Sequence, residues 1–195
     1  MNLHKMMATE NPAFRKADEL KLKGIMVHST GANNPWLRRY VAPDDGLLGK
    51  PYSKHWNKRT ATKAVHAFIG KLADGTVATY QVLPFDICAW HCGYATTAYK
   101  KQSGNLTHIA FEICEDAKND RAYMEATYRE AAEFCAMLCE EYDLPVESIC
   151  SHAEGYKLHI ASAHSDPTHW WKKFGYSMDD FRAEVRKIME EKRGG

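Results

Sequence analysis

The sequence predicts an α/β layered domain, on the basis of three observations. Short apolar runs bounded by turn residues indicate buried strands. These runs alternate with longer segments in which apolar residues recur at helical spacing, as expected of layered α/β folds. The length of 195 residues suits a single domain with one sizeable core, so we expect residues 1–195 to form one unit.

The expected strands are short, mostly apolar and bounded by turn residues. They lie at residues 24–28, 65–69, 77–82 and 109–114, with a short last strand at 149–150. The first strand stops at a turn-rich segment, and Ala73-Asp74-Gly75 marks a hairpin turn between the second and the third.

Two helices are expected in the C-terminal half. Over residues 121–142, apolar side chains recur at i, i+3 and i+4, which indicates an amphipathic helix. The last helix begins at Ser177, with Asp180 in the capping-box position, and extends to about residue 191. The segment before Gly24 is polar and irregular, so no regular element is expected there.

Charge and hydropathy exclude several classes of function. Lys and Arg number 26 against 25 Asp and Glu, a net charge of +1, which argues against a general nucleic-acid or polybasic membrane surface. No run of about 18 or more apolar residues occurs, so no membrane-spanning helix is expected. The first residues carry no apolar core typical of a signal peptide, so we expect synthesis in the cytoplasm without a classical signal peptide.

The cysteines form no CxxC motif and mostly sit in apolar surroundings. Without an export signal, we expect them to be buried, reduced thiols that pack as small hydrophobic residues. They are Cys88, Cys92, Cys114, Cys135, Cys139 and Cys150.

Four of the 10 histidines lie at or near the ends of expected strands: His28, His66, His91 and His152. One such histidine is usually structural, but several at strand ends can converge on one cleft. A zinc ion that activates water needs three protein ligands and an open fourth position. His28 and His152, with a third donor from residues 163–167, would make such a set, although spacing alone leaves a zinc site and structural roles equally open.

Glu112 is the most informative single residue. It lies among apolar residues in the expected strand 109–114, where an unpaired buried carboxylate would be costly. Alternation along the strand places its side chain opposite Phe111 and Ile113, facing a cleft. The alternative is a surface glutamate held in a salt bridge.

Several short motifs occur in an order that is similar to one known family. They lie at residues 24–30, 74–77 with 90–93, 109–114, and 151–152 with 164–167. Together they resemble the zinc-dependent N-acetylmuramoyl-L-alanine amidases of the amidase-2 type. This group includes phage endolysins, bacterial autolysins, the T7-lysozyme type and the peptidoglycan recognition proteins. The resemblance extends from about residue 24 to about residue 174, is greatest to prophage endolysins, and implies a central mixed β-sheet flanked by α-helices.

The resemblance also implies roles for individual residues. The metal ligands of the family correspond to His28, His152 and Asp166, and Zn²⁺ would be the cofactor. The catalytic glutamate corresponds to Glu112, and His164 takes the position of the group that polarises the scissile carbonyl. His164 is also the rival third ligand, in which case Asp166 is a turn-forming residue.

Aromatic residues and further histidines are expected around this site. By resemblance, Trp90 and His91 line the substrate groove; the alternative is a core tryptophan with a histidine at the rim. The pair Trp170 and Trp171 is expected in the core, with a sugar-binding edge as the alternative. His169 is expected at the surface.

The function implied is hydrolysis of the amide bond between N-acetylmuramic acid and L-alanine in peptidoglycan, which lyses the bacterial cell wall. We expect a monomer whose partner is this substrate and which reaches the wall after release through a holin or lysis. The alternatives are a non-catalytic peptidoglycan-binding module, a cysteine peptidase that uses Cys92 beside His91, and a muramidase with a carboxylate pair.

Overall fold

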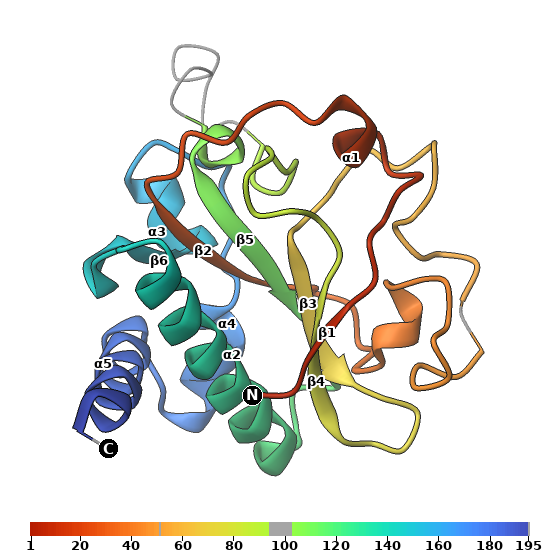
Figure 1. Cartoon of the computed structure of the whole chain (residues 1–195). Helices are drawn as coiled ribbons and strands as arrows, with labels where there is room; N and C mark the ends of the chain where they lie inside the picture. The colour runs from red at the N-terminus through yellow and green to blue at the C-terminus, as the bar shows by residue number, and fades with distance from the viewer. Residues whose placement is uncertain (51, 94–102, 195) are drawn as a thin grey trace.

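A computed structural model of the chain describes residues 1–50, 52–93 and 103–194. A six-stranded mixed β-sheet forms its centre, with the long helices packed on one face (Figure 1). In spatial order, the strands are β1 (Leu3–Lys5), β4 (Val77–Gln81), β3 (Ala67–Lys71), β5 (His108–Ile113), β2 (Gly24–Ser29) and β6 (Ile149–Ser151). β3 and β4 form the antiparallel hairpin, whereas the other neighbouring pairs are parallel. This architecture confirms the expected fold class.

Five α-helices occur among the described residues. They are α1 (Pro12–Lys16), α2 (Arg121–Glu141), α3 (His152–Lys157), α4 (Thr168–Trp171) and α5 (Met178–Gly194). Short 3₁₀ turns occur at η1 (Leu37–Arg39), η3 (Gly104–Leu106), η4 (Val146–Ser148) and η5 (Lys172–Phe174). Within the described ranges, none of these helices has the length and apolarity to cross a membrane.

The two faces of the sheet bury different cores, because successive side chains of a strand point to opposite sides. Ile25 and Phe111 face α2 and α5, and the Phe111 ring lies 5.4 Å from that of Phe134. Met26 and Ala110 face the other side, which irregular chain between β2 and β3 covers. His28 and Glu112 follow these two residues at spacing i+2, so they belong to the second face.

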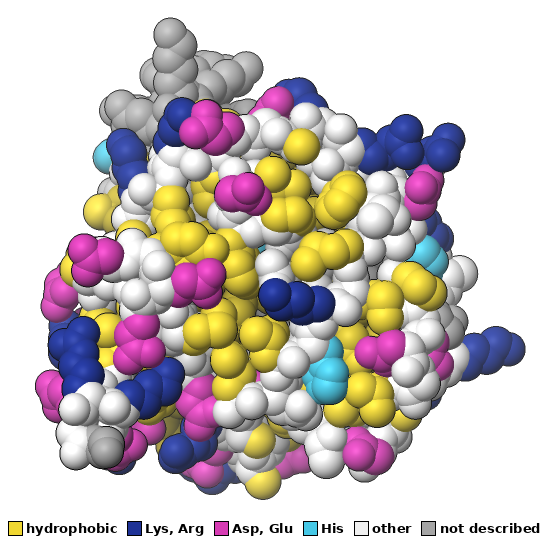
Figure 2. Space-filling view, viewed as in Figure 1, with side chains coloured by type: hydrophobic (Ala, Val, Ile, Leu, Met, Phe, Trp, Pro, Cys, Tyr) yellow, Lys and Arg dark blue, Asp and Glu magenta, His cyan; other side chains and the backbone are white. Residues whose placement is uncertain are grey.

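Charged side chains of both signs are interspersed over the outer surface near α5 in Figure 2. This distribution accords with a net charge of +1.

Most expected elements are present. The strand expected at 65–69 lies at Ala67–Lys71, and the C-terminal helix begins as predicted, since the Asp180 amide donates to Ser177 Oγ at 3.2 Å. The expectation of no regular element before Gly24 was wrong. β1 forms because it pairs with the sheet edge at β4, and α1 forms because Asn11 Oδ1 accepts the Ala13 amide at 2.9 Å and caps it.

The cysteine prediction is confirmed. All six thiols are free and buried. They pack among the apolar side chains of the two cores, and burial raises the pKa of Cys150 to about 12. These residues are therefore packing groups.

Candidate functional site

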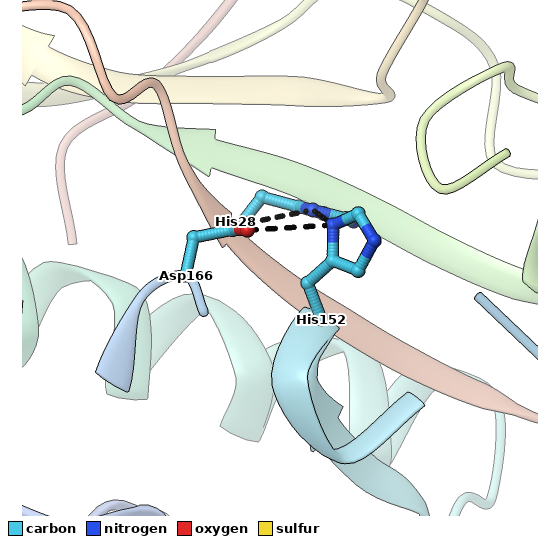
Figure 3. Close-up of side chains that lie close together, drawn as sticks. All are labelled: His28, His152 and Asp166. Atoms are coloured by element: carbon cyan, nitrogen blue, oxygen red, sulfur yellow. Dashed lines mark hydrogen bonds and ion pairs between the residues drawn. The ribbon is translucent and has the colours of Figure 1, made fainter. Parts of the chain in front are cut away.

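Three polar side chains from distant parts of the sequence converge at one edge of the sheet. They are His28 of β2, His152 at the start of α3, and Asp166 just before α4, which point toward one another in Figure 3. His28 Nδ1 lies 3.0 Å from Asp166 Oδ2 and 3.0 Å from His152 Nδ1. All three residues are buried, and one donor atom from each lies within 4.8 Å of the others.

Local structure brings each of the three to this point. β2 and β6 are parallel, so their carboxyl ends meet at the same edge of the sheet. His152 is the first residue of α3, whose capping box pairs Ser151 with Glu154. The Ser29 amide lies 3.4 Å from Asp166 Oδ2 and donates a weak hydrogen bond to it. A strand end thus positions His28, a helix N-terminus positions His152, and the Ser29 amide holds the Asp166 side chain.

We call His28, His152 and Asp166 the buried trio. Its electrostatics favour a neutral His28 imidazole beside an ionised Asp166 carboxylate. Burial lowers the pKa of His28, and the neighbouring Asp166 only partly opposes this. Burial opposes ionisation of Asp166, but hydrogen bonds from His152 and His28 outweigh it and hold its pKa well below the usual range. Two imidazole nitrogens and a carboxylate oxygen are a ligand set that Zn²⁺ accepts.

Glu112 lies beside the trio. It is the register partner of His28 on the neighbouring strand β5. Its Oε2 is inaccessible to solvent and has no hydrogen-bond partner among the described residues. Burial, with a smaller contribution from Asp166, raises the pKa of Glu112 to about 8. The alternative of a salt-bridged surface glutamate therefore does not fit, and the side chain is placed to exchange a proton with a group in the cleft.

A cleft of about 740 Å³ opens over these residues. Besides the trio, its walls include Lys63, Trp90, His91, Glu112, Lys118, His164 and His169. Trp90 lines the cleft and also packs on a small apolar cluster. Its position therefore has features of both a groove residue and a core residue. His91 Nδ1 lies 2.9 Å from His28 Nε2, which helps to orient the His28 ring.

His164 occupies the mouth of the cleft. Its side chain is 61% exposed, and its Nδ1 lies 3.9 Å from Asp166 Oδ1. The ring stacks on that of His152 with 4.6 Å between centroids. The imidazole is thus next to the buried trio but outside it, where it can reach a bound molecule.

Sequence reasoning missed a second polar group in the cleft wall. Glu115 is fully buried, and one of its carboxylate oxygens accepts from Ser29 Oγ at 2.5 Å. His169 Nε2 lies 3.0 Å from the same oxygen and Lys118 Nζ lies 3.2 Å from the other. His169 was expected at the surface, yet it lines the cleft. The one sequence signal was that Glu115 directly follows an apolar strand.

Two alternatives can be judged from burial. Trp170 and Trp171 are both fully buried, which confirms their place in the core and excludes a sugar-binding edge. Cys92 Sγ contacts Asn105 Oδ1 at 3.3 Å, and burial raises the pKa of Cys92 to about 11. Because the thiolate is the nucleophile in cysteine peptidases, this thiol is unsuited to that role.

Comparison with solved structures finds the same fold in a hydrolase, in a catalytic domain and in an endolysin. The Staphylococcus aureus hydrolase AmiA, solved in complex with its ligand, has a TM-score of 0.69 at 18% identity, with 99% of this chain and 84% of that chain covered. The PlyG catalytic domain has a TM-score of 0.62 at 19% identity, covering 97% and 96% of the two chains. A mutant endolysin from Bacillus subtilis has a TM-score of 0.59 at 20% identity, covering 95% and 99%.

Sequence comparison identifies the family. No curated protein sequence matches the chain. The family profile described as N-acetylmuramoyl-L-alanine amidase (Amidase_2), however, matches residues 18–169, which include the buried trio, Glu112 and His164. Because the match spans most of the sequence and the fold agrees with it, the chain belongs to the N-acetylmuramoyl-L-alanine amidase family.

Proposed function

We propose that this protein is a zinc-dependent enzyme that hydrolyses the amide bond between N-acetylmuramic acid and L-alanine in peptidoglycan. The observation that carries the proposal is the convergence of His28, His152 and Asp166 beside Glu112 in an open cleft. Membership of the amidase family supports the same substrate. We further propose that residues 1–195 act as one monomeric catalytic domain on the bacterial cell wall and cause its lysis.

The residues present fit a zinc ion. The trio offers two imidazole nitrogens and one carboxylate oxygen, all buried and all directed to one point. Three protein ligands leave a fourth position for water or substrate, the arrangement typical of catalytic zinc sites. When bound there, Zn²⁺ supplies a Lewis acid that polarises a carbonyl group and activates water for attack.

Glu112 performs the proton transfers in this proposal. Its carboxylate, which lines the cleft, accepts a proton from the attacking water and then delivers it to the nitrogen of the leaving L-alanine amine. The register of β5 against β2 supports this role, because it sets Glu112 next to His28 on the same face of the sheet. A single carboxylate thus acts first as base and then as acid.

His164 and the groove residues hold the substrate. The exposed His164 imidazole donates a hydrogen bond to the carbonyl oxygen as negative charge develops on it. Trp90 offers an aromatic surface in the cleft wall, and His91 lines the same cleft and contacts the His28 ring. We propose that these two residues contact the sugar or peptide near the scissile bond.

Zinc analysis combined with mass spectrometry of digested peptidoglycan tests the proposal. We expect about one zinc ion per chain and products in which stem peptides begin with a free L-alanine amine. New reducing sugar ends would indicate a muramidase, and cleavage within the peptide would indicate a peptidase. Binding of peptidoglycan without any product would indicate a non-catalytic module.

A further inference from the structure

Arg182 of the C-terminal helix α5 contacts the segment that carries His152. Arg182 Nη1 donates to the carbonyl oxygen of Ile149 at 2.9 Å and to Glu154 Oε2 at 3.1 Å. Its Nη2 donates to Glu154 Oε1 at 3.0 Å. The guanidinium therefore forms a fork-to-fork pair with one carboxylate while it also holds the first residue of β6.

These contacts bracket His152 in the sequence. Ile149 begins β6, and Glu154 is the third residue of α3. The same Glu154 Oε2 accepts the Ser151 amide at 3.0 Å and closes the capping box. Arg182 thereby joins the strand before His152 to the helix turn that contains it.

The ring of His152 contacts His28 and stacks on His164, but its second nitrogen is held only weakly. Its Nε2 lies 3.4 Å from Ser162 Oγ, whereas His28 Nε2 lies 2.9 Å from His91 Nδ1. Metal-binding histidines usually have their second ring nitrogen fixed by a strong hydrogen bond. The orientation of the His152 ring therefore depends more on its backbone than that of the His28 ring does. Arg182 contacts the residues on either side of this backbone.

We propose that Arg182 is a positioning residue for the metal site, which it serves by fixing the junction of β6 and α3. The inference rests on the proposed function, because it takes His152 as a zinc ligand. It goes beyond the family assignment, since α5 lies outside the matched residues 18–169. Arg182 is not among the described residues that line the cleft, and in this proposal it acts through Glu154 and His152.

The helix offers a matched control. Arg186 lies one turn further along α5 and pairs with Glu147 at 2.5 Å, but its side chain is 45% exposed against 16% for Arg182. Both arginines bridge α5 to the region around β6, and only Arg182 reaches Glu154. Phe181, Val185 and Ile188 anchor α5 to the core, so neither substitution should detach the helix.

The experiment compares zinc affinity in wild type, R182Q, E154Q and R186Q by competition with a chelator, together with the melting temperature of each metal-free protein. We expect R182Q and E154Q to bind Zn²⁺ at least about 10-fold more weakly than wild type. R186Q is expected to match wild type, because exposed ion pairs contribute little. R182K keeps the positive charge but cannot form the two-pronged pair with Glu154. Its zinc affinity should therefore lie between those of wild type and R182Q.

The absorption spectrum of bound Co²⁺ gives a readout of ligand geometry that does not depend on activity. We expect an altered spectrum in R182Q and an unchanged one in R186Q. Equal zinc affinity and equal spectra in R182Q, E154Q and R186Q would overturn the inference while leaving the proposed function intact. Failure of the wild type to bind Zn²⁺ would overturn both. If R182Q does not fold, R182K and E154Q decide the question.

Discussion

His28 and Glu112 are register partners on the neighbouring parallel strands β2 and β5. Adjacent strands lie about 4.8 Å apart, so side chains on the same face of such a pair are immediate neighbours. One of these residues joins the buried trio, and the other has a carboxylate oxygen without a partner among the described residues. The sheet thus sets a candidate metal ligand beside a candidate base.

Replacing Glu112 with Gln preserves the shape of the side chain but removes its proton acceptor. We expect amide hydrolysis to slow by at least about 100-fold, while the zinc content remains that of wild type. Mass spectrometry of released stem peptides gives the rate, and metal analysis gives the zinc content. E190Q, on the exposed side of α5, serves as the control. A wild-type rate in E112Q would show that another group moves the proton.

Asp166 and His164 compete for the role of third ligand, and two substitutions separate them. In D166N the charge that the two imidazoles face is lost, so we expect the purified protein to lose zinc and activity together. H164A is expected to keep its zinc and to lose about 100-fold in rate, the effect of removing one oxyanion donor. The reverse pattern, with zinc kept in D166N and lost in H164A, would make His164 the ligand.

Cys92 lines the cleft next to His91 but is expected to play no chemical part. Its pKa of about 11 keeps it a protonated thiol near neutral pH. We therefore expect iodoacetamide to leave lysis unchanged, chelators to abolish it, and added zinc to restore it. C92S should retain activity per folded molecule. Inactivation by iodoacetamide with insensitivity to chelators would favour the cysteine peptidase.

His66 should make the stability of the protein depend on pH. It is fully buried, donates from Nε2 to the Ile87 carbonyl at 2.9 Å and accepts the Ala110 amide at Nδ1. Burial lowers its pKa from 6.5 to about 4, so between these values the unfolded chain binds more protons than the folded one. Stability is therefore lost as the pH falls through this window.

The size of the effect can be measured by urea unfolding of the metal-free protein. Between about pH 7.5 and about pH 5, this histidine should account for a loss of about 2 kcal/mol. H66Q removes the titrating group, so its unfolding free energy should change less over the same interval, even though the protein is less stable at neutral pH. Identical pH dependence in wild type and H66Q would contradict the assignment.

Local sequence patterns predicted the elements whose stabilising contacts lie between near neighbours in the sequence. The helix expected at 121–142 is observed as Arg121–Glu141, because its apolar stripe and its buried face coincide. The capping box at Ser177 is likewise a contact between near neighbours in the sequence. β1 was missed because a three-residue strand at a sheet edge has no periodicity, and its pairing partner β4 lies far along the chain.

The candidate site likewise contains residues that the sequence indicated and residues that it did not. The placement of Glu112 within an apolar strand was visible in the sequence, since a carboxylate there demands an explanation. The polar group around Glu115 was not, because two of its partners, Ser29 and His169, come from distant segments of the chain. His169 shows this most clearly, since nothing beside it in the sequence indicates that it faces Glu115.

The sequence by itself determined the fold class and the family, and motif order identified the residues of the candidate site. Only the tertiary structure decided that His28, His152 and Asp166 meet within 4.8 Å and that His164 stays outside this group. It also decided that Arg182 of α5 contacts Ile149 and Glu154, on either side of His152 in the sequence. The physical reason is that strand order and helix docking arise from long-range packing of two cores, which local periodicity does not specify.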